Sequence, residues 1–162
     1  MQRDAEVSRV YAVEDAWSAV LDRGGLVDFF GSSLQVPAQR RFGDLAAMQA
    51  YSDFCLARTG RDVPAVTIRT RRGQRRAHYE AVGGAAVIAI PLQAQWACRE
   101  AVLLHELAHH VTCTMFNPGS RHHCPRFRGA MCWLAGLALG PEAALLLRTG
   151  YQGAGMEVAD VP

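Results

Sequence analysis

The middle of the sequence contains the pattern H-E-x-x-H, in which the polar residues are His105, Glu106 and His109. Residues four apart in a helix lie on one face, about one turn apart. Two imidazoles at this spacing can bind one Zn²⁺, for which histidine nitrogen at about 2.0–2.1 Å is an ordinary ligand. Glu106 lies about 100° further round such a helix, where its carboxylate can take a proton from an attacking water. The pattern predicts a zinc hydrolase with Glu106 as general base and acid.

A catalytic zinc site needs a third protein ligand and keeps one position open for water. The sequence Asn-Pro-Gly at residues 117–119 predicts a turn that brings the chain back after the H-E-x-x-H helix. His123 follows this turn and directly precedes a helix opened by Pro125, so it is the preferred third ligand. His122 and Glu142 are the alternatives.

Two further residues of metal-binding type lie on the same predicted helix. His110 is next to His109 and points about 100° away from it. Cys113 continues the row of His105 and His109, but it lies roughly 12 Å along the helix from His105. Neither residue is expected to share an ion with the two histidines of the motif.

The third-ligand segment also resembles a known family. Residues 123–127, His-Cys-Pro-Arg-Phe, are similar to the H-G-x-x-F segment that follows H-E-x-x-H in SprT-like zinc metallopeptidases. In that family the histidine is the third ligand, which implies the same role for His123. Cys124 stands where the family pattern has glycine, and a positive φ at that position would strain a cysteine.

A second resemblance, to a family of actinobacterial and actinophage metallohydrolases, is closer and covers most of the chain. It runs through residues 36–43, 72–80, 99–110 and 140–144. The resemblance implies a zincin fold and a zinc hydrolase, but it implies no particular substrate. The reaction expected of such a site is hydrolysis of a peptide bond, with a peptide or protein as substrate.

The rest of the sequence predicts the elements that must position these residues. Apolar periodicity predicts helices over residues 4–21, 45–57, 93–116, 126–139 and 142–148. Alternating or apolar runs predict strands over residues 65–71, 76–80 and 85–90, joined by glycine turns into a small antiparallel sheet. Residues 150–162 are rich in glycine and are expected to form a loose tail. This order of elements predicts a compact α+β zincin-like domain.

The composition sets the class of protein. Half of the 162 residues are hydrophobic and 20% are charged, which excludes a disordered or collagen-like chain. No run approaches the ~18 apolar residues of a membrane span, so no membrane partner is expected. The charged N-terminus gives no sign of an export signal, and the five cysteines form no C-x-x-C pair, so reduced thiols are expected. These features predict a cytoplasmic protein with one domain over residues 1–162.

Two alternatives to the enzyme remain open. A fourth protein ligand, Cys124 or His122, would close the zinc site, which is typical of a structural, non-catalytic module. The other alternative is a nucleic-acid-associated protease, because five arginines lie on the predicted hairpin: Arg69, Arg71, Arg72, Arg75 and Arg76. The net charge of only +2 and the lack of interleaved aromatic residues argue against nucleic acid as the main partner.

Overall fold

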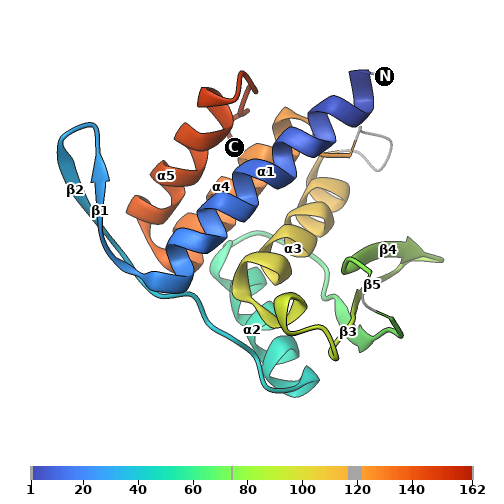
Figure 1. The fold of residues 1–162 in the computed structure, drawn as a ribbon. Coiled ribbons are helices and arrows are strands. Elements are labelled where there is room, and N and C mark those ends of the chain that lie inside the picture. Colours follow the sequence, from blue (N-terminus) through green and yellow to red (C-terminus); the bar gives the residue numbers. More distant parts are fainter. Residues whose placement is uncertain (1, 74, 117–121, 162) are drawn as a thin grey trace. The chain divides into compact units, whose positions relative to one another are not determined.

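The backbone described by the computed structural model covers residues 2–73, 75–116 and 122–161 (Figure 1). In chain order its elements are α1 (Gln2–Arg23), β1 (Gly25–Phe29), β2 (Ser32–Val36), α2 (Leu45–Arg58), β3 (Thr67–Thr70), β4 (His78–Val82), β5 (Ala85–Ile90), the 3₁₀ helix η1 (Gln95–Cys98), α3 (Glu100–Met115), α4 (Pro125–Leu139) and α5 (Pro141–Gly153). The predicted α+β class is confirmed. No helix within these residues is long and apolar enough to cross a membrane.

The chain divides into two compact units. The first consists of Met1–Gln39 together with Arg121–Pro162, and the second is Arg40–Ser120. The prediction that residues 1–162 form one domain stays a prediction.

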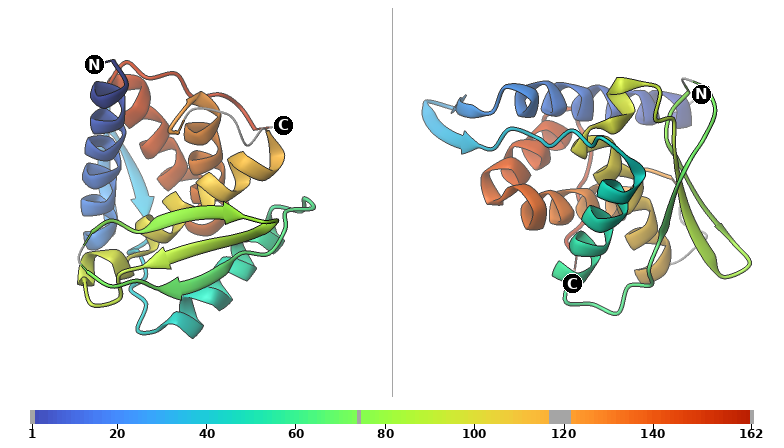
Figure 2. Two further views of the ribbon diagram at one scale, coloured as in Figure 1. Left: turned by 90° about the vertical axis from the view of Figure 1, so that its right-hand side faces the viewer. Right: turned by 90° about the horizontal axis from the view of Figure 1, so that it is seen from below.

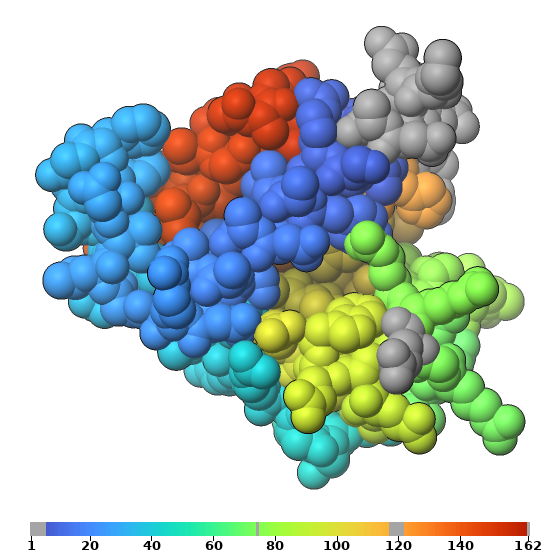
Figure 3. Space-filling model, viewed as in Figure 1, coloured from blue at the N-terminus to red at the C-terminus, as the bar shows by residue number. Residues whose placement is uncertain are grey.

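The first unit packs α1, α4 and α5 around an apolar core. Val10, Trp17, Leu134 and Leu147 are buried, and the Trp17 indole donates a hydrogen bond of 3.0 Å to the carbonyl of Ala143. Burying side chains of this size stabilises a fold by about 1.5–3 kcal/mol each. The antiparallel pair β1–β2 follows α1 as a hairpin, which is the light-blue projection on the left of the space-filling view (Figure 3).

The C-terminal end of the chain differs from the expected loose tail. α5 continues to Gly153, and Tyr151 and Met156 are buried. The amide of Ala159 donates a hydrogen bond of 3.0 Å to the carbonyl of Pro125, at the start of α4. The glycine content suggested conformational freedom of the backbone, but the packing of this segment on α4 could not be inferred from local sequence.

The second unit contains α2, η1, α3 and a three-stranded sheet. The strand order is β3-β5-β4, with β3 parallel and β4 antiparallel to β5 (Figure 2, left). The predicted antiparallel sheet is therefore wrong in one pairing, because β5 lies between the two strands that were expected to form a hairpin. One face of the sheet contributes Ile68, Ile88 and Ile90 to the core, where Leu103 and Leu107 of α3 are also buried.

The helix predicted over residues 93–116 is interrupted at Arg99. This residue has extended backbone, with φ −85° and ψ 148°, and forms a bridge with Arg41. The flanking amides complete the pairing, because Phe42 donates to the carbonyl of Cys98 and Glu100 donates to that of Arg40. These long-range bonds end η1 and set the point at which α3 begins.

Candidate metal centre

The two histidines of the H-E-x-x-H motif lie together on α3. Their ring centroids are 5.0 Å apart and the ring planes meet at 75°. His105 is 5% exposed, Glu106 is 6% exposed and His109 is half-buried. The expectation that residues four apart share a helix face is confirmed for this pair, and the site lies in a largely buried part of the helix.

A buried carboxylate fixes the start of α3. Glu100 is fully buried, and it accepts hydrogen bonds of 2.7 Å from both the amide and the guanidinium of Arg40. It also accepts a bond of 2.5 Å from the Tyr51 hydroxyl. The Glu100 charge raises the pKa of Arg40, and burial is the main cause that raises the pKa of Tyr51. Sequence reasoning missed this cluster because its members lie far apart along the chain.

Both ring nitrogens of His110 form hydrogen bonds with residues outside the motif, as expected from its direction on the helix. Its Nε2 lies 2.6 Å from the Pro64 carbonyl, which can only accept, so Nε2 carries the proton. Nδ1 therefore accepts from the Tyr79 hydroxyl at 3.1 Å. Burial lowers the pKa of His110, which favours this neutral form.

The same tyrosine contacts His109. The Tyr79 ring lies parallel to the His109 ring, at 7° and with centroids 6.4 Å apart. β4 thus supplies one side chain that bonds to His110 and faces His109. Burial raises the pKa of Tyr79 to about 12, so its hydroxyl keeps its proton at neutral pH.

His123 lies just before α4 in an unusual backbone conformation. Its φ is +59°, in the left-handed region, whereas Cys124 has φ −63° and ψ 172°. The positive φ that would strain a cysteine at position 124 is therefore found at the preceding residue, His123. The His123 side chain is buried and meets the rings of Tyr11 and Phe127 edge-on, at 5.3 Å and 4.9 Å between centroids.

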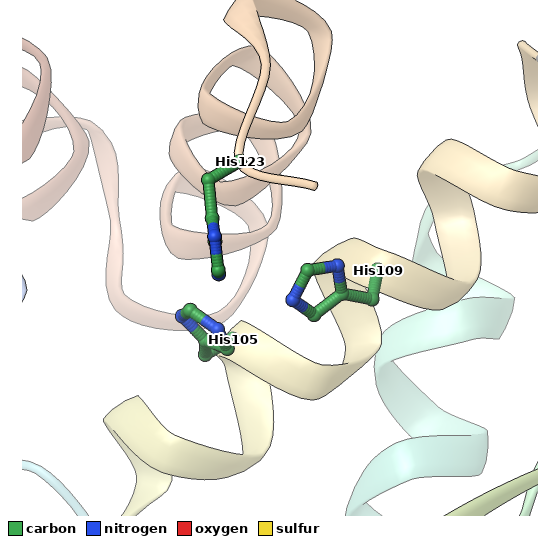
Figure 4. Close-up of side chains that lie close together, drawn as sticks. All are labelled: His105, His109 and His123. Carbon is green, nitrogen blue, oxygen red and sulfur yellow. The ribbon is translucent and has the colours of Figure 1, made fainter. Parts of the chain in front are cut away.

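The structure brings together the three histidines that the sequence singled out (Figure 4). One ring nitrogen from each of His105, His109 and His123 lies within 4.8 Å of the other two. No other set of three or more possible ligands is found among the described residues. This group could hold a metal ion, and imidazole donors suit zinc, copper, iron or nickel.

The alternative third ligands have other surroundings. His122 is exposed, and the carboxylate of Glu142 accepts a hydrogen bond from the backbone amide of Gln35 in β2. Cys124 is half-buried as a free thiol, as is Cys113. None of these four residues belongs to the histidine group found in the described part of the chain.

The segment predicted as an arginine hairpin is not a hairpin, but three of its five arginines line one hollow. Arg69 and His78 flank Ala89 of β5 in the sheet register. Together with Arg71 and Arg72 these residues line an open hollow of about 410 Å³. The charge there is reduced by an ion pair of 2.7 Å between Arg69 and Glu80, which lowers the pKa of that carboxyl.

Comparisons with known proteins give no information on the function of this chain. No protein-family profile, no curated protein and no solved structure matches the chain. The function must therefore be inferred from the side chains themselves.

Proposed function

We propose that this protein is a zinc-dependent hydrolase, and specifically a metallopeptidase that cleaves peptide bonds. The observation that carries the proposal is the group of His105, His109 and His123, whose ligand nitrogens lie within 4.8 Å of one another. The residue after the first of these histidines is Glu106, a buried carboxylate. Metal-assisted hydrolysis needs ligands that hold the metal ion and a group that accepts a proton from water, and these residues could supply both.

The donor set fits an open zinc site. Catalytic zinc has three protein ligands and a free position, whereas structural zinc has four protein ligands. The group found among the described residues has three members and includes neither Cys124 nor His122. When bound, zinc would supply a Lewis acid for the substrate carbonyl and for water. The presence of three ligands and not four also argues against a structural zinc site, as in the non-catalytic alternative.

Glu106 would carry the proton. Its carboxylate would accept a proton from the attacking water and then donate it to the leaving amine. Low exposure, at 6%, limits competing hydration of the carboxylate and strengthens its interactions with charge in the site. His105 and His109 would hold the ion from one face of α3, and His123 would complete the set.

The decisive variant is Glu106→Gln, which keeps the size of the side chain and removes its basicity. We expect about one zinc per chain to be retained and hydrolysis to fall by about 10²–10⁴-fold, the usual contribution of a general base. Activity would be assayed on fluorescence-quenched peptides of mixed sequence and on a denatured protein. Asp62→Asn is the matched control, because Asp62 is an exposed carboxylate outside the candidate site. Wild-type rates in Glu106→Gln would exclude this mechanism.

A second candidate function is association with nucleic acid at the hollow lined by Arg69, Arg71 and Arg72. The three arginines and His78 that line this hollow favour it. Each lost phosphate contact reduces the slope of log affinity against log salt by about 1. Arg72→Ala should show this reduction for single-stranded DNA, and Arg58→Ala, which removes an exposed arginine of α2, should not. Absence of binding at low salt would exclude this function.

A further inference from the structure

We propose that Arg128 is a positioning residue that holds His123 in its left-handed conformation and thereby sets the affinity of the metal site. This proposal rests on the proposed function, since it needs the three-histidine group to bind zinc. It assigns a role to a buried arginine that the motif does not contain.

The backbone of His123 needs an external constraint. The left-handed region is energetically unfavourable for a residue with a side chain, so only contacts with its surroundings can hold the residue there. With φ +59°, His123 is one of two non-glycine residues with positive φ in the described chain. The other, Phe30, is 86% exposed at the turn between β1 and β2. His123 is instead 6% exposed, so its conformation is imposed inside a packed region.

The Arg128 side chain supplies that constraint. It follows His123 by five residues, in the first turns of α4, and only 2% of it is exposed. Nη1 donates a hydrogen bond of 2.6 Å to the carbonyl of His123. A bond of this kind fixes the peptide plane that follows the residue, and the residue's ψ is thereby restrained. The guanidinium is planar and rigid, so it holds a direction better than an ammonium would.

The arginine is itself held at two other points. Nη1 also donates at 2.8 Å to the carboxylate of Glu6 in α1, and Nε donates at 2.6 Å to the carbonyl of Glu157 beyond α5. A buried charge is stable only when it is paired and hydrogen-bonded, and these partners meet that condition. Arg128 therefore links α1, the C-terminal segment and His123 in one cluster.

The imidazole of His123 is constrained separately from its backbone. Tyr11 and Phe127 meet the ring edge-on from two elements, at 67° and 88°. The backbone and the ring of His123 are thus both held by protein contacts that do not involve a metal ion, and one of its ring nitrogens lies within 4.8 Å of those of His105 and His109 (Figure 4). A preorganised third ligand loses less entropy on binding and so gives higher affinity.

The test is the zinc affinity of Arg128→Lys, measured by competition with a chromophoric chelator. Lysine keeps the charge but cannot make the three directed bonds. Removing partners that orient metal ligands costs about 10–100-fold in affinity, and we expect a loss in that range. The visible spectrum of the Co²⁺-substituted protein should also change, since it reports ligand geometry. The spectrum of the Co²⁺-substituted wild-type protein serves as the reference.

Arg9→Lys is the matched control. Arg9 also donates to a carbonyl of the C-terminal segment, that of Ala154 at 2.9 Å, but none of its described bonds involves His123. The zinc affinity of Arg9→Lys should stay within twofold of that of wild type. Equal losses of affinity in both variants, or none in Arg128→Lys, would overturn the positioning role.

Two further outcomes are separable. If wild type binds no zinc, the proposed function fails and the positioning role fails with it. If Arg128→Lys does not fold, Glu6→Gln decides, because it removes the counter-charge of the guanidinium and leaves the arginine in place. Weaker zinc binding and an altered Co²⁺ spectrum in Glu6→Gln support the role, and wild-type values in both contradict it.

Discussion

Adjacent histidines take different roles on α3 because their neighbours differ. His109 is part of the three-histidine group, whereas both ring nitrogens of His110 are used by Pro64 and Tyr79. Helix periodicity alone predicts that the two side chains point in different directions, but the partners of His110 come from a loop and from β4. The chemistry of each ring is thus set by residues that the motif does not include.

Tyr79→Phe tests the division of roles between these rings. The change removes the hydroxyl that donates to His110 and keeps the ring that faces His109. Loss of one such hydrogen bond should lower the free energy of unfolding by about 0.5–1.5 kcal/mol in urea titrations. Zinc stoichiometry should not change. Loss of zinc in this variant would show that the hydroxyl serves the metal site.

Two buried thiols should be inert in the folded protein. Burial raises the pKa of Cys55 to about 11 and that of Cys132 to about 12. A thiol with a pKa of about 11 is thiolate in roughly one molecule in a thousand at pH 8, and the thiolate is the reactive form. Brief alkylation at pH 8 followed by mass spectrometry should leave both unmodified, while the half-buried Cys98 and Cys124 react. Labelling of Cys55 before denaturation would contradict this prediction.

Elements were easier to predict than the way they pair. The spacing of the H-E-x-x-H motif and the apolar periodicity around it predicted the helix, and Pro125 predicted the start of α4. The positions of the three predicted strands were also close, but the pair β1–β2 and the order β3-β5-β4 were not predicted, since pairing depends on residues that lie apart in sequence. The interruption at Arg99 arises in the same way, from its bridge with Arg41.

Two glycines of α4 should respond in opposite directions to alanine. A Cβ on Gly129 would lie 1.9 Å from the backbone oxygen of Ala159, so the C-terminal segment would have to move. A Cβ on Gly136 would lie 3.5 Å from the Cβ of Ala144, an ordinary contact. Gly129→Ala should lower the free energy of unfolding by about 1–3 kcal/mol. Gly136→Ala should raise it by about 0.5–1 kcal/mol through helix propensity.

Chemical unfolding of both variants checks this pair. Equal stabilities would show that the segment beyond α5 does not pack on α4 as described. Far-ultraviolet circular dichroism of the folded variants should be the same, because the helix itself is kept.

The molecule as a whole should lose stability in alkali. The thiols of Cys55 and Cys132 and the phenols of Tyr51 and Tyr151 are buried, and burial raises the pKa of each. In the unfolded chain the thiols ionise near pH 9 and the phenols near pH 10, so that chain binds fewer protons there than the folded protein does. The free energy of unfolding should therefore be unaffected by these four groups below pH 9 and fall as the pH rises from 9 to 11.

Urea titrations at a series of pH values measure this fall. The double variant Cys55→Ala and Cys132→Ala should move its onset from the thiol range toward pH 10, where the tyrosines ionise. A free energy of unfolding that stays constant from pH 8 to 11 would contradict the burial of these groups.

At the scale of the molecule, the candidate site was only partly predictable. The three histidines could be named from spacing and from the turn predicted at residues 117–119, which lie outside the described residues. The residues that hold them could not, because Arg128 bonds to Glu6 and Glu157, which lie 122 and 29 residues away from it in the sequence. Long-range polar clusters leave no local pattern, so a structure is needed to find them.

Zinc content by elemental analysis tests the central claim most directly. The wild-type protein, His123→Ala and His122→Ala would be purified in parallel, offered zinc and freed of excess. The three-histidine group predicts about one zinc per chain in wild type and in His122→Ala, and much less than one in His123→Ala. No zinc in wild type, or full zinc in His123→Ala, would contradict the assignment of His105, His109 and His123 as the metal site.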